Sequence, residues 1–207
     1  MKKRIQGESK EQLFLHAGKE PEVLDLPPSQ YLAIEGCGNP EAAAFQVAIG
    51  ALYSVAYTIK FTLKKAGKPD FKVSPLEAIW SVGTAKTVTA DMWKAPRAEW
   101  RWKALIRMPE SVKKADVEAA KRAVIAKRGE GSVPRVLLER IAEGKVIHIL
   151  HVGPYATEPE SVAKMQALMK GDRLVPRGLH HEIYLGDPRR AKPEKLKTIL
   201  RQPVAAA

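Results

Sequence analysis

The clearest alternation of apolar and polar residues lies near the C-terminal end, over residues 178–186. Successive side chains of a strand point to opposite faces, so this alternation predicts a strand with two unlike faces. One face would carry Leu179, His181, Ile183 and Leu185, and the other would carry His180, Glu182 and Tyr184. The first face can join a core, whereas the second holds a carboxylate between two hydrogen-bonding rings. Glu182 is therefore either a structural glutamate paired with a lysine or arginine, or part of a solvated or functional site.

Helical spacing of apolar residues marks three further segments. The longest begins at the Asn39-Pro40-Glu41 cap and stops at 64–67, where cations and a glycine end it. An alanine-rich, charged segment at 112–128 has the composition of a helix that ends at a glycine. A third helix follows Thr157, which stands three residues before Glu160 as in a capping box, and it extends to residue 170.

The remaining apolar runs indicate strands, each bounded by proline, glycine or polar residues. We expect strands at 31–36, 71–82 with an irregularity at a proline, 99–107, 136–141, 145–152 and, as an edge strand, 195–201. The connection through Glu143-Gly144 favours a hairpin of 136–141 with 145–152. Helix propensity alone would also allow a short helix at 135–142.

The order of these elements is similar in the two halves of the chain. It predicts an α+β fold of two β-α-β-β modules in a pseudo-two-fold arrangement. We expect one domain over 1–207, with the first module at about 22–129, the second at about 130–207 and an N-terminal extension at 1–20. Helices packed on one side of the two sheets would leave the other side concave. The predicted ligand site is the groove between the modules on that side.

The composition is that of a globular protein, with 45% hydrophobic residues in a chain of 207. A formal charge of +12 raises the question of nucleic acid, which stays as a weaker alternative. The basic residues are spread along the chain without a recognition helix or interleaved stacking aromatics, so we expect no nucleic-acid partner. No uninterrupted apolar run approaches the roughly 20 residues that span a bilayer, and residues 1–8 lack the apolar block of a signal peptide. We expect a soluble, cytoplasmic protein without a membrane partner.

Residues that suit a ligand groove gather in two further places. Within 23 residues the chain has four tryptophans, Trp80, Trp93, Trp100 and Trp102. Trp100 and Trp102 would share a strand face, so both line the groove or both belong to the core. Tyr155 follows Gly153-Pro154 at a strand-to-helix junction, where its phenol either projects into a site or bonds locally in the turn. A carboxylate between such aromatic walls would pair with a cationic or proton-donating ligand.

The histidines and the cysteine indicate no metal site. His180 and His181 are neighbours on a strand and point to opposite faces, and His148 and His151 also differ in parity. The single cysteine, Cys37, excludes a thiolate cluster, and its place in an apolar strand predicts a packed thiol. We expect no metal and no cofactor.

Several motifs together resemble one known family. They are 180–190 with 193–204 behind it, His151-Val152-Gly153-Pro154-Tyr155, the helix start at 158–165, and the stretches 27–40 and 102–109. The chain resembles stand-alone members of the GyrI-like small-molecule-binding family. The resemblance implies two β-α-β-β modules with the ligand between them. It also implies that Glu182 corresponds to the family's buried glutamate, which meets lipophilic cations in multidrug-responsive regulators, and Tyr155 to the tyrosine of its Gly-Pro-Tyr element.

Two functions follow from these residues and the resemblance. The first is binding of lipophilic aromatic, in part cationic, small molecules in the groove. Its ligand-binding residues would be Glu182, Tyr155, Tyr184, His180, Trp102, Trp100, Trp80 and Trp93. The alternative, which some stand-alone family members exemplify, is hydrolysis of cyclopropane-containing genotoxic compounds, with Glu182 activating a water and Tyr155 donating a hydrogen bond. No residue indicates a protein partner or an oligomeric state.

Overall fold

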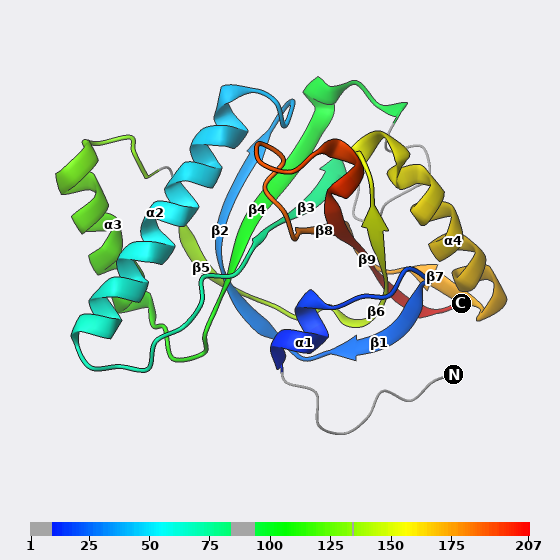
Figure 1. The fold of residues 1–207 in the computed structure, drawn as a ribbon, viewed down its shortest axis with the longest axis horizontal. Helices are drawn as coiled ribbons and strands as arrows, with labels where there is room; N and C mark the ends of the chain where they lie inside the picture. Colours follow the sequence, from blue (N-terminus) through cyan, green and yellow to red (C-terminus); the bar gives the residue numbers. More distant parts are fainter. Residues whose placement is uncertain (1–9, 84–93, 134) are drawn as a thin grey trace.

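The strands form one large, curved antiparallel sheet in the computed structural model, which describes residues 10–83, 94–133 and 135–207 (Figure 1). Their order across the sheet is β1-β6-β9-β8-β3-β4-β2-β5, and the short β7 pairs with β9 off this path. The strands of the first half are β1 (Glu22–Leu26), β2 (Ser29–Cys37), β3 (Leu76–Val82) and β4 (Trp100–Met108). Those of the second half are β5 (Leu137–Ile141), β6 (Gly144–Val152), β7 (Leu174–Pro176), β8 (His180–Tyr184) and β9 (Lys197–Ala206).

The order strand, helix, strand, strand occurs twice along the chain. The first run is β2, α2 (Ala43–Lys65), β3 and β4. The second is β6, α4 (Glu158–Gly171), β8 and β9, with β7 inserted after α4. β3 and β8 pair at the centre of the sheet, so the two runs meet there. The α+β class predicted from the sequence is confirmed.

The outer strands β1 and β5 each pair with the other half of the chain. β1 pairs with β6, and the same register continues beyond Pro27-Pro28 as β2 on β5. The two predicted strands near Glu143 are therefore confirmed, but the predicted hairpin between them is wrong. The continuous partner at 22–33 satisfies the backbone groups of both strands, so β5 and β6 follow each other along it instead of folding back. The alternative short helix at 135–142 is wrong for the same reason.

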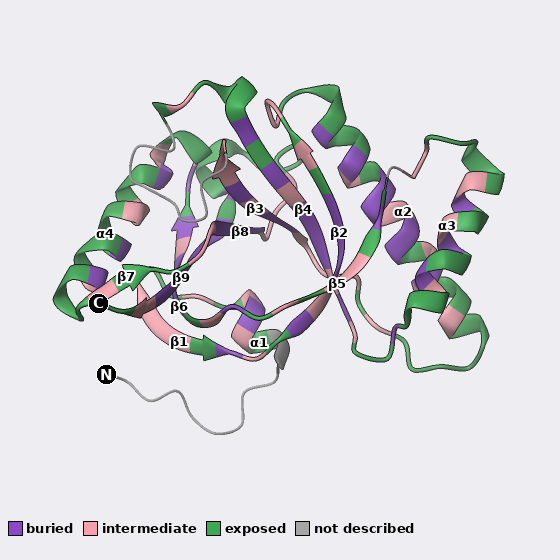
Figure 2. Ribbon diagram, turned by 180° about the vertical axis from the view of Figure 1, so that it is seen from behind, coloured by how far each residue is buried: buried purple, intermediate pink, exposed green. Residues whose placement is uncertain are grey.

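α2 is the core helix of the first half. It turns one face to the sheet and the other to solvent (Figure 2). The buried face consists of Phe45, Ala48, Ala51, Leu52, Val55, Ala56 and Ile59. By length and composition α2 would also pass for a membrane span, but this face packs in the core cluster as that of a folded domain does. The helix begins at Ala43, later than the predicted cap at Asn39, because Asn39 Oδ1 accepts a hydrogen bond from the Glu41 N–H in a local turn.

Three other helices cover parts of the sheet and of α2. α3 (Lys114–Arg128) packs on α2 and adds Val117, Ala120 and Val124 to the same core. α4 covers the second half through Met165 and Met169. α1 (Lys10–Leu15) buries Phe14. Short 3-10 helices lie at Arg97–Glu99, Tyr155–Thr157 and Pro193–Lys195.

Four smaller sequence predictions need correction. The segment 71–82 becomes a strand only at Leu76, since Pro75 has no N–H for a ladder. The C-terminal strand is not an edge strand, because β9 lies between β6 and β8. Cys37 is exposed, since it is the last residue of β2, where Glu35 on the same strand face is exposed as well. The capping box at α4 is absent, because the Thr157 hydroxyl donates to the Pro154 carbonyl.

Gly36 leaves room for the Trp102 indole. A Cβ at Gly36 would lie 2.2 Å from a ring carbon of Trp102, its cross-strand partner. The Phe45 ring also packs edge-on against the indole, with 5.0 Å between centroids. We expect Gly36→Ala to lower the free energy of unfolding by about 1–3 kcal/mol through overpacking, measured by urea denaturation. Gly50→Ala on α2, where an added Cβ meets nothing within 4 Å, should be neutral or stabilising. Equal responses of the two variants would contradict the prediction.

Candidate functional site

Glu182 lies on the face of the sheet that carries the helices. Its cross-strand neighbours are Ala78 on β3 and Leu200 on β9. Ala78 belongs to the core cluster of α2, and Leu200 to the cluster that includes Met165 of α4. The predicted position of the site, on the face without helices, is therefore wrong. The registers of β3 and β9 put their helix-facing apolar residues beside Glu182, and α2 and α4 stand on either side of β3 and β8 (Figure 1).

Glu182 is buried, with 5% exposure, and it has defined polar contacts. The Tyr184 hydroxyl donates to Glu182 Oε2 at 2.7 Å. Trp80 Nε1 donates to the same hydroxyl at 3.1 Å, so a chain of hydrogen bonds runs from indole through phenol to carboxylate. His180 Nε2 lies 3.4 Å from Glu182 Oε1. No lysine or arginine in the described part of the chain forms an ion pair with Glu182, so its interpretation as the partner of a basic side chain is wrong.

A second carboxyl group, that of Glu158, is near enough to Glu182 for the two charges to interact. Glu158 is the first residue of α4 and is 5% exposed. The Thr198 side chain hydrogen-bonds the Glu158 carboxyl group, whereas the buried Glu158 Oε1 has no hydrogen-bond partner in the part of the chain that the structure describes. Burial, and next the charge of Glu182, raise the pKa of Glu158 to about 10. Glu158 therefore carries a proton at neutral pH.

Sequence reasoning missed Glu158. The spacing of Thr157 and Glu160 presented residue 158 as one of several acids in an exposed first helical turn. The available signal was its place three residues after Tyr155, in the turn that leads from β6 into α4. Position within that turn, not residue type, decides that Glu158 is buried while Glu160 is exposed.

Tyr155 and Tyr184 add two phenols to the site. Their rings meet edge to face, with centroids 6.1 Å apart and planes at 84°. Burial, followed by the charges of Glu158 and Glu182, raises the pKa of Tyr155 to about 12. Burial and the Glu182 charge hold the pKa of Tyr184 well above its usual value. Both phenols stay protonated and act as donors, and Tyr155, with 41% exposure, is the one open to a ligand.

The Gly-Pro-Tyr turn sets the positions of Tyr155 and Glu158. His151 on β6 anchors it, with Nδ1 3.0 Å from Ser161 Oγ and Nε2 3.2 Å from the Pro154 carbonyl oxygen. Gly153 has a φ of 143°, which side-chain-bearing residues rarely adopt, and a Cβ there would press on His151 and Thr157. The turn therefore depends on a glycine and a histidine that the sequence motif contains.

The loop after β8 lies between the two helices that flank the site (Figure 1). Asp187 Oδ1 accepts from the Arg189 N–H at 3.0 Å and from Arg189 Nε at 2.9 Å, which forms a compact turn. These bonds lower the pKa of Asp187 to about 2. The negative charge of Asp187 contributes to the raised pKa values of Tyr53 on α2 and of Tyr155. The second part of the C-terminal motif is thus a charged turn beside the aromatic site residues.

The tryptophans differ in their relation to the site. Trp80 reaches it through Tyr184 and is 3% exposed. Trp100 and Trp102 share a strand face as predicted, but that face is packed into the core against Trp80 and Phe45. Their role in ligand binding stays a prediction. Trp93 lies outside the described residues.

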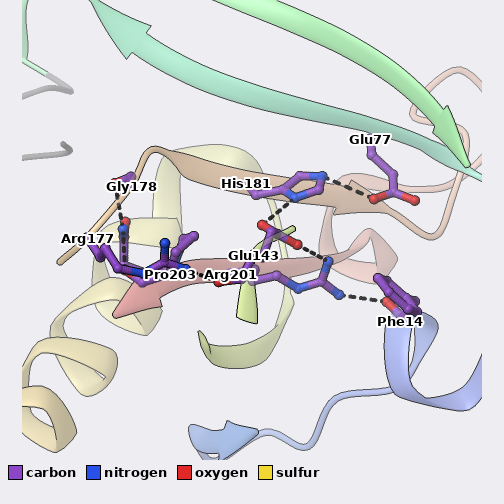
Figure 3. Close-up of polar contacts among 9 residues, drawn as sticks. Phe14, Glu77, Glu143, Arg177, Gly178, His181, Arg201 and Pro203 are labelled. Atoms are coloured by element: carbon purple, nitrogen blue, oxygen red, sulfur yellow. Dashed lines mark hydrogen bonds and ion pairs between the residues drawn. The ribbon is translucent and has the colours of Figure 1, made fainter. Parts of the chain in front are cut away.

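The opposite face of the sheet holds a buried ionic network (Figure 3). His181 Nδ1 lies 2.9 Å from Glu143 Oε1, and His181 Nε2 lies 3.0 Å from Glu77 Oε2. Arg201 Nη1 donates to Glu143 Oε2 at 3.1 Å, and its Nη2 donates to the Phe14 carbonyl at 2.8 Å. The predicted burial of the His181 face is confirmed, but its ionic partners were not predicted.

His181 and Glu143 stabilise each other's charged forms. Burial alone would lower the pKa of His181, but Glu143 and Glu77 outweigh it and raise the value to about 9. Burial alone would raise the pKa of Glu143, but His181 and Arg201 outweigh it and lower the value to about 2. At neutral pH His181 is therefore protonated and Glu143 is ionised. Within the described residues, no three or more His, Cys, Asp or Glu side chains are grouped so that they could hold a metal ion.

Comparison with known proteins gives three informative likenesses. No protein-family model matches the sequence, and no curated protein does. An uncharacterized conserved protein from Listeria innocua is 36% identical, with a TM-score of 0.86 over 95% of this chain and 97% of that chain. A hydrolase from Listeria innocua is 34% identical, with a TM-score of 0.83 over the same shares. The EcmrR C-terminal domain is 8% identical, with a TM-score of 0.57 over 91% of this chain and 98% of that chain, and shares the fold alone.

Proposed function

Because the chain belongs to the same family as these Listeria innocua proteins, we propose that it is a hydrolase of lipophilic aromatic small molecules that acts at the Glu182 site. The observation that carries this proposal is a buried carboxylate, Glu182, beside two phenols that keep their protons. A base and proton donors on one surface are the groups needed to add water to an electrophile. The relative described as a hydrolase supports this class of reaction.

The proposed substrate contains a cyclopropane conjugated with a carbonyl group, as the resemblance to GyrI-like stand-alone members indicates. Glu182 takes a proton from water while the water oxygen attacks a ring carbon. The strained C–C bond breaks, and its electron pair moves to the carbonyl oxygen, to which Tyr155 donates a hydrogen bond. Tyr155 and Tyr184 contact the flat part of the substrate.

A second candidate function is binding of lipophilic cations without turnover. It is favoured by the surroundings of the two buried carboxyl groups. Among the described residues, Glu182 contacts Tyr184 and His180, and Glu158 contacts Thr198, so neither is paired with a lysine or arginine. A cation entering between Glu158 and Glu182 would supply the missing positive charge, and the tyrosines would add cation-π contact. In this case wild-type protein binds the aromatic cation ethidium but turns over no strained-ring substrate.

We further assign the chain to the GyrI-like group, as one domain whose modules, at about 22–129 and 130–207, are related by a pseudo-two-fold axis between β3 and β8. The equivalent strand orders β3-β4-β2 and β8-β9-β6 support this relation. The fold likeness to the EcmrR C-terminal domain is consistent with it. We also place the protein in the cytoplasm, as its sequence led us to expect.

Glu182→Gln tests the proposed function. We expect kcat for hydration of a spirocyclopropyl cyclohexadienone to a hydroxyethyl phenol to fall by about 10²-fold or more, because the amide cannot accept the proton of water. Product formation is followed by liquid chromatography, and a neutral aromatic ligand should bind the variant unchanged. Glu118→Gln, at an exposed position on α3, is the matched control and should keep wild-type activity. Unchanged turnover in Glu182→Gln would eliminate the role of Glu182, and absence of turnover in wild type would eliminate the hydrolase.

A further inference from the structure

We propose that Glu158 is the proton donor of this site and forms an acid–base pair with Glu182. The inference rests on the proposed hydrolase function and adds a second catalytic carboxyl group to it. Glu182 would take the proton of the attacking water, and Glu158 would give a proton to the oxygen that receives the electrons. The two groups come from different elements, the start of α4 and the middle of β8.

The first argument is the environment of the Glu158 carboxyl group. It is 5% exposed, and its buried Oε1 has no hydrogen-bond partner over residues 10–83, 94–133 and 135–207. An ionised carboxylate in such a place loses its hydration without replacement, so the neutral acid is favoured. The helix N-terminus opposes this with a partial charge of roughly half a unit, whereas Glu182 acts with a full negative charge. The raised pKa of Glu158 agrees with the stronger influence of burial and Glu182.

The second argument decides which member of the pair keeps the proton. Glu182 accepts a hydrogen bond of 2.7 Å from the Tyr184 hydroxyl, and such a donor stabilises a carboxylate. Among the described residues, the carboxyl group of Glu158 receives the bond with Thr198, while its Oε1 has no hydrogen-bond partner. Among the described residues, the other titratable groups on which the Glu158 charge acts are Tyr155, which is neutral below a pKa of about 12, and Tyr184, whose pKa is held well above its usual value. Glu182 is therefore the base, and Glu158 is the acid.

This assignment balances the reaction. Water loses a proton to Glu182, and its oxygen forms a C–O bond as the strained C–C bond breaks. The electron pair of that bond reaches the carbonyl oxygen, which takes the Glu158 proton and becomes a phenol. Substrate and water are thereby joined, with no oxidation or reduction. The proton on Glu182 returns to Glu158, directly or through solvent, before the next turnover.

Glu158→Gln tests the donor role. The amide keeps the size and hydrogen-bonding capacity of the acid but has no acidic proton, so we expect kcat for the spirocyclopropyl cyclohexadienone to fall by about 10²-fold or more. Ethidium binding, measured by fluorescence, should persist and shows that the site is folded. Glu158→Asp retains an acid and should recover part of the lost rate. Glu160→Gln, on the exposed side of the same helical turn, should match wild type.

The pH dependence of kcat separates a donor from a structural residue. In wild type the rate should fall as pH rises through the Glu158 pKa of about 10, below the Tyr155 pKa of about 12. The residual rate of Glu158→Gln should lack this fall. Full activity in this variant, or an unchanged alkaline fall, would overturn the donor role and leave the hydrolase intact. Absence of turnover in wild type would overturn both.

Discussion

Glu143→Ala is expected to lower the free energy of unfolding by about 3–5 kcal/mol, measured by urea denaturation at neutral pH. The substitution removes the carboxylate shared by His181 and Arg201, whose side chains are both 0% exposed. His181 keeps Glu77 as a partner, but the Arg201 guanidinium retains only the Phe14 carbonyl and the Phe14 ring. A buried cation left without its counter-charge costs more than the lost contact itself.

Glu139→Ala is the matched control for this variant. Glu139 also forms a short ion pair, at 2.6 Å with Lys103, but the two side chains are 27% and 25% exposed. Lys103 keeps a second partner in Glu35 at 2.9 Å, so we expect a loss of about 1 kcal/mol or less. Replacing both charges, with Glu143→Leu and Arg201→Met together, should recover part of the stability lost in Glu143→Ala. A loss of less than about 1 kcal/mol in Glu143→Ala would contradict the prediction.

The faces of individual strands were predictable because side-chain direction follows from local backbone geometry. His180, Glu182 and Tyr184 do share one face of β8, and His181 with Ile183 shares the other. What covers each face is a property of the whole fold. The positions of α2 and α4 depend on the registers of β3 and β9, which no local pattern contains. The prediction of which residues share a face of β8 was therefore right, and the prediction that the Glu182 face lies on the helix-free side of the sheet was wrong.

Long-range pairing also explains what the sequence did not reveal. Glu77, Glu143 and Arg201 each look like an ordinary surface charge in their own segment. They meet only because β3, β8 and β9 are adjacent and the β5–β6 connection passes beside them. The hairpin prediction failed through the same limitation, since the competing partner at 22–33 is distant in sequence. The burial of Glu158 was closer to being predictable, because it depends on the conformation of a single local turn.

Glu158→Gln is expected to raise the free energy of unfolding at pH 7 by about 3 kcal/mol while it lowers kcat. The pKa of Glu158 is raised from 4.5 to about 10 in the folded protein. Above pH 4.5 the unfolded chain releases this proton and the folded protein keeps it, so unfolding becomes more favourable as pH rises. The contribution is fully present below the unfolded pKa and is lost as pH rises through the folded pKa. Glutamine avoids this loss because it does not titrate.

The pH range of the measurement can separate Glu158 from His181, whose pKa is also raised, from 6.5 to about 9. Stability from His181 is lost only above pH 6.5, so a decline between about pH 5 and 6.5 belongs to Glu158. Urea denaturation should show a decline of up to about 2 kcal/mol there in wild type, and none in Glu158→Gln. In Glu182→Gln the neighbouring charge is absent, which lowers the pKa of Glu158 and weakens the decline.

If Glu158→Gln is less stable than wild type at pH 7, the carboxyl group is held ionised and cannot be a donor. A variant that is more stable and less active would instead mean that the proton on Glu158 is retained for catalysis at the expense of stability.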